Sequence, residues 1–138
     1  MITLGLNRDA ELIRREVFVE EQGFQHEFDE IDARALHLVL YEGTRPVATG
    51  RLFRGEGTDG IVYWIGRVAV RKCARGRSLG RAVLAALEAE AARLGGSEVR
   101  LSAQLQAEGF YEKQGYRRCG AEYLDEHCPH VEMRKRLK

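Results

Sequence analysis

The residues best suited to chemistry lie in the turn from Arg71 to Gly80, which directly precedes a helix-like pattern. Backbone N–H groups in the first turn of a helix have no acceptor within the helix, and the helix dipole gives that end a partial positive charge. Glycine lets an anion approach the main chain closely, and the arginines of the turn add charge. The segment therefore suits a pyrophosphate, although many solvated turns share its pattern, Arg-Gly-x-x-x-Gly from Arg75 to Gly80.

Two elements must position this turn, one on each side of it. The apolar run Ile61–Val70 predicts a strand that is buried on both faces, at the centre of a sheet. Gly66 within the run can permit a bulge or a close backbone approach. After the turn, apolar residues recur at helical spacing until Gly95-Gly96 ends the pattern. These residues are Leu79, Val83, Leu87, Ala91 and Leu94.

Helix patterns also occur on both sides of this central part. Asn7 or Asp9 can cap a helix that runs to about Gln22, where Gly23 ends it. Residues 24–33 form an acidic loop or a short helix with aromatic anchors, and Ala107–Gln114 forms a short helix. The apolar face of the first helix consists of Leu12, Ile13, Val17 and Phe18.

Alternating apolar residues predict the strands that complete a mixed sheet. Glu42-Gly43-Thr44-Arg45 joins two of them as a hairpin, and Gly55, Gly57 and Gly60 mark the next turn. The order is β-α-(α)-β-β-β-α-β-α-β-β, an α/β (α+β mixed) domain with helices packed on one sheet. Besides 61–70, the predicted strands are residues 2–6, 36–41, 46–53, 99–103, 116–124 and 131–137.

The composition is that of an ordinary globular protein and argues against several function classes. The 138 residues, 44% of them hydrophobic, predict a single domain over 1–138. Lys and Arg, 22 in all, nearly cancel 21 Asp and Glu, so we expect no nucleic-acid partner. No run reaches the roughly 18 apolar residues of a membrane span, and no secretory signal is visible. Cys73, Cys119 and Cys128 lack Cys-x-x-Cys spacing and indicate reduced thiols in a cytoplasmic protein.

The central turn and its flanking strand resemble the acetyl-CoA signature of the GNAT superfamily. That signature consists of Arg or Gln, two residues, Gly, one residue, and then Gly or Ala. Here it is matched by Arg75, Ser78 and Gly80, after the strand residues Val68-Ala69-Val70. Ser78 replaces the usual middle glycine, so its side chain must point away from the phosphate or donate to it.

A second segment, Ala107–Tyr116, resembles the superfamily pattern Ala-x-x-Phe-Tyr-x-Lys-x-Gly-Phe. The resemblance implies that Tyr111 lies near the cofactor sulfur and acts as general acid to the departing thiolate. Without the resemblance, Phe110 and Tyr111 would only anchor a short amphipathic helix. The similarity to the ElaA/YjcF-type branch extends over nearly the whole chain; the stretches that carry it include 17–22, 29–32, 37–38, 101–104 and 128–133.

The resemblance implies a GNAT-type fold, with a mixed, mostly antiparallel sheet of about seven strands flanked by about four helices. It implies an N-acetyltransferase that moves the acetyl group of acetyl-CoA to a primary amine of a small molecule or peptide, by direct transfer in a ternary complex. No metal takes part, and a homodimer is compatible because dimers are common among relatives. The cofactor-binding residues implied are Val68, Ala69, Val70, Arg75, Gly76, Arg77, Ser78, Leu79, Gly80, Arg81, Gln104 and Tyr111.

The sequence leaves the general base open. An alkylamine with a reference pKa of about 10.4 is mostly protonated at neutral pH, so a base or a water chain must remove the proton. The strand 61–70 holds no carboxylate. His130 is one candidate because imidazole titrates near neutrality, although a structural histidine at a strand start is the more common situation. The other candidates are Glu21, Glu30, Asp32, His37 and Glu126.

Several alternatives stay open. The acidic residues of the loop, Glu27, Asp29, Glu30 and Asp32, could attract a cationic amine or simply be solvated, whereas Arg51 and Arg67 could hold a substrate carboxylate. A non-catalytic acyl-CoA-binding module would explain the same motifs. An ATP-binding enzyme is disfavoured because the sequence has no Gly-x-x-x-x-Gly-Lys-Ser/Thr loop.

Overall fold

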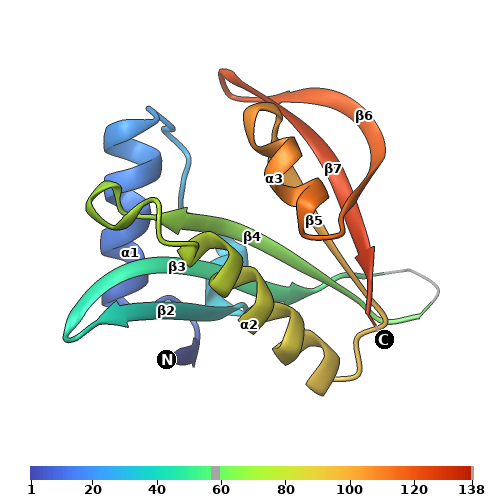
Figure 1. Cartoon of the computed structure of the whole chain (residues 1–138), viewed down its shortest axis with the longest axis horizontal. Coiled ribbons are helices and arrows are strands. Elements are labelled where there is room, and N and C mark those ends of the chain that lie inside the picture. Colours follow the sequence, from blue (N-terminus) through green and yellow to red (C-terminus); the bar gives the residue numbers. More distant parts are fainter. Residues whose placement is uncertain (57–59, 138) are drawn as a thin grey trace.

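The computed structural model of the protein describes residues 1–56 and 60–137, so Gly57, predicted in a turn, lies outside the described residues. Over this range the chain forms one sheet flanked by helices (Figure 1). The strands are β1 (Ile2–Leu4), β2 (Leu36–Glu42), β3 (Arg45–Arg54), β4 (Val62–Val70), β5 (Glu98–Gln104), β6 (Arg117–Asp125) and β7 (Cys128–Arg136). The α-helices are α1 (Arg8–Arg14), α2 (Leu79–Arg93) and α3 (Glu108–Lys113). A π-helix, η1 (Arg15–Glu21), continues α1, and three 3₁₀ turns are η2 (Glu30–Ala33), η3 (Lys72–Ala74) and η4 (Leu105–Ala107).

The strands within the described residues follow the order β1-β2-β3-β4-β5-β7-β6 across the sheet. The neighbours β4 and β5 run parallel, because α2 carries the chain back between them, and the other described neighbours run antiparallel. The expected mixed, mostly antiparallel sheet of seven strands is therefore confirmed, with β4 at its centre. Strand β7 inserts between β5 and β6.

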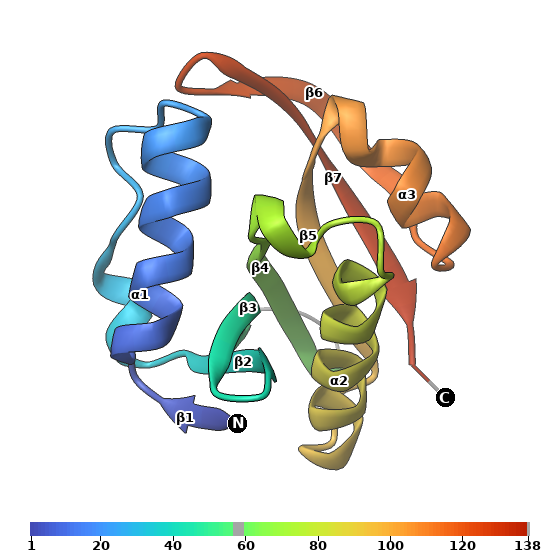
Figure 2. The same ribbon diagram turned by 60° about the vertical axis from the view of Figure 1, so that its left-hand side comes forward.

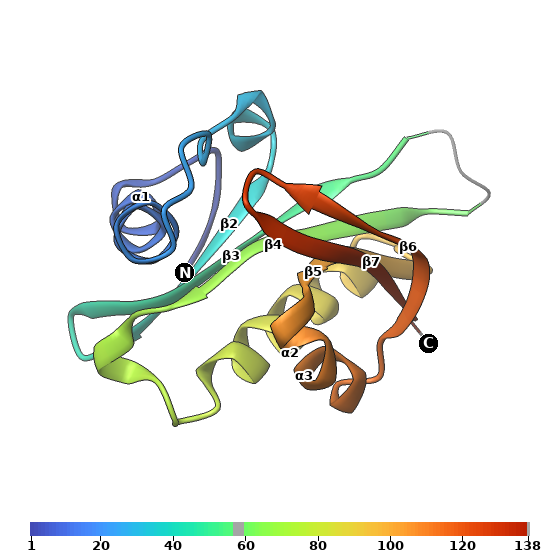
Figure 3. The ribbon, with the colours of Figure 1, turned by 90° about the horizontal axis from the view of Figure 1, so that it is seen from above.

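The two faces of the sheet are covered by different helices. Helix α1 lies on one face, and α2 and α3 lie together on the other (Figure 2, Figure 3). Side chains alternate between faces along a strand, so Ala69 of β4 packs into the α1 cluster, whereas Val68 and Val70 pack toward the cluster around α2. Because both faces of β4 are covered, its nearly unbroken apolar sequence is accounted for.

Some sequence expectations were wrong in detail. Leu12, placed on the apolar face of the first helix, is 48% exposed, whereas Arg14 is only 1% exposed because carboxylates of the following loop surround it. The first strand ends at Leu4, and Leu6 lies outside it. The spacing Gly-x-Gly-x-x-Gly that starts at Gly55 links two antiparallel strands, so it lacks the strand-to-helix context of a dinucleotide-binding turn.

Candidate active site

The sheet opens between its two parallel strands. Strands β4 and β5 pair from Val62–Ile65 to Glu98–Leu101 and then separate (Figure 1). The register of β4 against β3 shifts at this point, between Thr49 and Arg51, and Arg67 adopts a positive φ of 53°. A bulge bends the strand that contains it. The edge of β4 that faces β5 therefore has no strand partner over residues 66–70 in the described structure. The bulge itself lies at Arg67 and Val68, just past Gly66, which still pairs with Arg51.

The turn before α2 leaves several of its main-chain N–H groups without a hydrogen-bond partner in the described structure. Within the described residues, the N–H groups of 76–81 have no hydrogen-bond acceptor, and the first helical bond at this end is donated by Ala82 to Ser78 O at 3.1 Å. Ser78 is the N-cap in a left-handed conformation, φ 59°, and its side chain makes no capping bond. A left-handed backbone is the conformation that glycine adopts most easily, which explains why the signature usually has glycine here.

The turn lies close to the separation of the strands. A Cβ built on Gly80 would lie 3.5 Å from Phe110 and 3.9 Å from Val70. Phe110 precedes Tyr111 on α3, and Val70 ends β4. The N-terminus of α2, the end of β4 and α3 therefore lie next to one another, although none of residues 76–81 lines the pocket described below.

The arginines of the turn pair with carboxylates of neighbouring elements. Arg75 makes two hydrogen bonds of 2.7 Å to Glu21, and its Nε donates to Val70 O. Arg71 pairs with Glu16 at 2.7 Å, and Arg77 pairs with Glu42. Exposed pairs of this kind contribute little to stability, so a bound diphosphate could displace the carboxylates at small cost.

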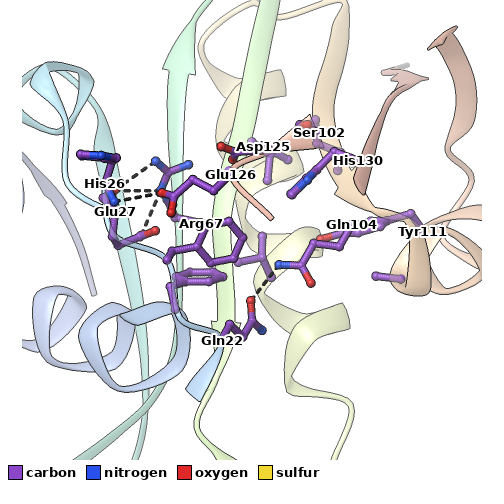
Figure 4. Close-up of a pocket in the computed structure, with 17 residues that line it drawn as sticks. Gln22, His26, Glu27, Arg67, Ser102, Gln104, Tyr111, Asp125, Glu126 and His130 are labelled. Carbon is purple, nitrogen blue, oxygen red and sulfur yellow. Dashed lines mark hydrogen bonds and ion pairs between the residues drawn. The ribbon is translucent and has the colours of Figure 1, made fainter. Parts of the chain in front are cut away.

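A pocket of about 390 Å³ lies where β4 and β5 separate (Figure 4). Its floor is formed by Gly66, Arg67 and Val68 of β4, and its other walls come from η1, the loop after it, β5, α3 and the β6–β7 turn. The polar side chains that line it are Gln22, His26, Glu27, Arg67, Ser102, Gln104, Tyr111, Asp125, Glu126 and His130. The pocket thus unites Val68, Gln104, Tyr111 and His130 of the expected site.

Tyr111 projects from α3 into this pocket. Its ring makes edge contacts with Phe110 and Tyr116, at centroid distances of 5.1 and 5.9 Å. Its hydroxyl has no hydrogen-bond partner among the described residues. Burial raises the pKa of Tyr111 to about 12, so the side chain stays protonated and can donate its proton at neutral pH.

His130 enters the pocket from the start of β7 and is 6% exposed. Its Nδ1 lies 2.8 Å from the carbonyl oxygen of Cys128. Because a carbonyl oxygen only accepts, Nδ1 carries the hydrogen, and a neutral ring keeps Nε2 as a hydrogen-bond acceptor. Nε2 has no partner in the part of the chain that the structure describes, and the ring points toward the middle of the pocket in Figure 4. His130 therefore has the orientation and tautomer of a proton acceptor.

The other candidate bases are less suited to that role. Glu21 is held by Arg75, and Glu30 is exposed and does not line the pocket. Asp32 accepts from Arg14 and Arg51, and His37 is fully buried, with Nε2 donating to Asp32 O. Glu126 lines the pocket, but hydrogen bonds from the amides of Gln25 and His26 hold its pKa below the usual range, which weakens it as a base.

The acidic loop is tied to arginines from three elements. Glu27 lies 2.9 Å from the guanidinium groups of both Arg14 and Arg67. Asp32 lies 2.7 Å from Arg14 and 2.9 Å from Arg51, which also holds Asp29 at 2.8 Å. These three carboxylates and three arginines neutralise one another. Glu27, Asp29 and Asp32 are therefore not available to a cation, whereas Glu30 of the same loop is exposed to solvent. Arg51 is not available to a substrate carboxylate.

Gln104 closes one side of the pocket. Its Nε2 donates to Gln22 Oε1 at 2.8 Å, and its Oε1 accepts from Gln106 at 2.7 Å (Figure 4). Gln22 is the C-cap of η1, so this amide chain spans from the first helix to β5 across the gap between the parallel strands. Sequence reasoning missed Gln22, and it also missed Phe24 and Asp125 as pocket residues, because their proximity depends on long-range packing.

Similarity to known proteins agrees with this architecture. Residues 8–137 match the family described as "Acetyltransferase (GNAT) domain". The chain is 39% identical over 131 residues to a Bacillus subtilis (strain 168) protein named "Uncharacterized N-acetyltransferase YjcF", with 93% of this chain and 91% of that protein covered.

Two solved structures have closely similar folds. Escherichia coli ElaA is 25% identical with a TM-score of 0.80, over 98% of this chain and 99% of ElaA. An acyl-CoA N-acyltransferase from Pseudomonas aeruginosa is 28% identical with a TM-score of 0.83, over 98% of this chain and 97% of that one. GNAT enzymes use an acyl-CoA co-substrate and act on amines. The chain belongs to the GNAT acetyltransferase family and is an acyltransferase enzyme.

Proposed function

We propose that this enzyme transfers an acetyl group from acetyl-CoA to a primary amine of a small molecule or peptide, directly within a ternary complex. The observation that carries the proposal is the row of N–H groups at residues 76–81, which have no acceptor among the described residues and lie next to the end of β4 and to Phe110 of α3. The free cysteines agree with a reducing, cytoplasmic setting.

The donor would be held mainly by main-chain groups. The N–H groups of 76–81 bind the diphosphate with help from the positive end of α2. The pantetheine arm pairs with the free edge of β4 at residues 66–70, next to Val68, Ala69 and Val70. Gln104 lies on the opposite wall and can turn its amide toward the arm by releasing Gln22. Arg75, Arg77 and Arg81 add positive charge at the turn.

Two side chains would handle protons while acetyl-CoA supplies the thioester. Nε2 of His130 accepts the proton that the ammonium group must lose before the amine can attack. A main-chain N–H near residues 68–70 hydrogen-bonds the thioester oxygen as negative charge develops there, an effect typically worth about 3 kcal/mol. The Tyr111 hydroxyl then protonates the departing thiolate. His130, Tyr111 and Val68 of β4 all line the same pocket.

The direct test is acetyl-CoA consumption across a panel of polyamines, amino acids, aminoglycosides, arylalkylamines and peptide N-termini, with products identified by mass spectrometry. We expect at least one amine to gain an acetyl group in step with thiol release. Tight acetyl-CoA binding with no thiol release for any amine would indicate a non-catalytic binding module instead.

Initial-rate kinetics test the ternary complex separately. Direct transfer requires donor and acceptor to be bound together, so double-reciprocal plots at several fixed amine concentrations should intersect. Parallel lines would indicate an acetylated enzyme and would exclude direct transfer.

A further inference from the structure

Resting on the proposed function, we propose that the acceptor is an amine with a second positive charge, such as a diamine or polyamine, whose second ammonium binds Asp125 and Glu126. Both residues line the pocket where β6 turns into β7, and Figure 4 shows them on the rim above Arg67. Three observations support this proposal: the charges of the pocket, the position of His130 and an apolar part of the pocket wall.

Negative charge in the pocket is unevenly compensated. Three carboxylates line it, and Glu27 is neutralised by Arg14 and Arg67. Asp125 and Glu126 have no lysine or arginine partner within the described residues. Most other carboxylates of this protein do have one, including Glu21, Asp29 and Asp32 of the neighbouring segments. Two uncompensated charges at one pocket rim favour a cationic ligand.

Glu126 is fixed in place by the loop that forms the opposite wall. Its two carboxylate oxygens accept hydrogen bonds from the N–H groups of Gln25 and His26, at 2.8 and 2.9 Å. These bonds keep its pKa below the usual range, so the group stays ionised. Each oxygen retains a lone pair for a further donor, so an ammonium group can bind without breaking the existing bonds.

His130 supplies an independent observation in the same pocket. The residue is only 6% exposed, and Nε2 faces the cavity without a partner among the described residues. A proton acceptor and a pair of carboxylates at different positions in one pocket suit a substrate with two amines. One amine loses its proton to His130 and reacts, and the other keeps its charge at Asp125 and Glu126.

Part of the pocket wall is apolar. Phe24, Ile65 and Leu101 line the pocket, and the Phe24 ring lies 6.4 Å from that of His130 and 5.0 Å from that of His127. A chain of methylene groups can pack on this wall while its ends reach the two polar positions. Arg67 offers little to a substrate carboxylate, because Glu27 and Asp29 already accept from its guanidinium group.

The transfer step balances without another reactant. The nitrogen–acyl bond forms as the carbon–sulfur bond breaks. The reacting ammonium loses two protons on becoming an amide: His130 takes the first before the attack, and the second replaces the proton that Tyr111 gives to the thiolate. The second ammonium keeps its charge throughout, so it contributes binding energy without entering the chemistry.

The test compares three acceptors of equal chain length at saturating acetyl-CoA: putrescine, aminobutanol and γ-aminobutyrate, whose far ends are positive, neutral and negative. We expect kcat/KM for putrescine to exceed that for aminobutanol by about 10-fold or more. The reason is that only putrescine can make charge-assisted hydrogen bonds to the two carboxylates with its far end. γ-Aminobutyrate should be the poorest acceptor. In Asp125→Asn the preference for putrescine should fall to about 3-fold or less.

Glu30→Gln is the matched control, because it removes one exposed carboxylate that does not line the pocket. It should keep the wild-type preference. If the wild-type enzyme acetylates aminobutanol or γ-aminobutyrate as well as putrescine, the dication proposal is overturned while the proposed function stands.

If no acceptor is acetylated, the proposed function fails, and calorimetric titration of putrescine into the CoA-saturated protein decides the inference on its own. Binding that weakens in Asp125→Asn but not in Glu30→Gln supports the dication site. Absence of binding, or equal binding to the wild-type protein and Asp125→Asn, overturns it.

Discussion

Tyr111 and His130 illustrate how single residues gain a role from their surroundings. The hydroxyl of Tyr111 has no partner among the described residues, and partial burial of the side chain raises its pKa to about 12, so it stays protonated. His130 is oriented by one carbonyl oxygen, that of Cys128. The sequence predicted the short helix that contains Tyr111. It could not predict that His130 would share its pocket, because the two residues come from elements separated by β6.

Replacing Tyr111 with phenylalanine removes the proton donor and keeps the ring contacts. We expect Tyr111→Phe to lower kcat by about 100-fold, the size of a typical general-acid effect, with acetyl-CoA affinity little changed. Because a raised pKa keeps the group protonated as the pH rises, the wild-type rate should show no loss from Tyr111 ionisation below about pH 10. An unchanged kcat, or a tyrosine-dependent fall in rate near neutral pH, would exclude this role.

Ser78 adopts a left-handed backbone without using its side chain as a cap. An L-residue pays about 1–2 kcal/mol for this conformation, and glycine avoids that cost while losing some chain entropy on folding. Ser78→Gly should therefore raise the free energy of unfolding by up to about 1 kcal/mol, measured by urea denaturation, without weakening acetyl-CoA binding. The control is Ser102→Gly in strand β5, where the backbone is extended and glycine has no advantage. This change should lower the free energy of unfolding. A clear loss of stability in Ser78→Gly would contradict the strain assigned to this residue.

At the level of elements, ion pairs tie the loop after η1 to α1, β3 and β4. Arg14, Arg51 and Arg67 come from these three elements and hold Glu27, Asp29 and Asp32. This network lies beneath the pocket and fixes the loop whose amides bind Glu126. The acidic residues were visible in the sequence, but their partners were not, since each arginine pairs with residues at least 13 positions away.

Asp32 makes this network sensitive to acid. Burial alone would raise the pKa of Asp32, but hydrogen bonds from Arg14, the Asp29 amide and Arg51 outweigh burial and lower the pKa to about 2. A lowered pKa gives stability that is present above the unfolded value of 3.8 and is lost as the pH falls through about 2. That contribution is about 2 kcal/mol.

Removing the charge tests the network. Asp32→Asn leaves Glu27 as the remaining carboxylate partner of Arg14 and Asp29 as that of Arg51, and the lost charged hydrogen bonds should cost about 2 kcal/mol at neutral pH, measured by denaturant unfolding. The free energy of unfolding of Asp32→Asn should also fall less between pH 4 and pH 2 than that of the wild-type protein. Glu30→Gln, on an exposed neighbour, should change stability by less than about 0.5 kcal/mol. Equal acid sensitivity in the wild-type protein and Asp32→Asn would mean that Asp32 does not hold the loop.

At the scale of the whole molecule, the sheet brings separate segments to one opening. Parallel β4 and β5 separate past Ile65 and Leu101, and the flanking elements line the gap. Periodicity predicted most strands and helices, because apolar spacing is a local property. It could not predict that β7 lies between β5 and β6, because strand order depends on long-range pairing; the family resemblance implied the sheet type instead.

The central claim is that the N–H groups of 76–81 bind the donor diphosphate, and calorimetric titration of acetyl-CoA into Ser78→Asp tests it most directly. Aspartate tolerates this backbone and favours a helix N-terminus, so the fold should be kept while a negative charge enters the anion site. We predict that the affinity of Ser78→Asp for acetyl-CoA falls about 10-fold or more, with no loss of melting temperature. The control is Ala89→Glu, which adds the same charge on the exposed side of α2 and should bind acetyl-CoA like the wild-type protein. Wild-type affinity in Ser78→Asp would contradict the claim.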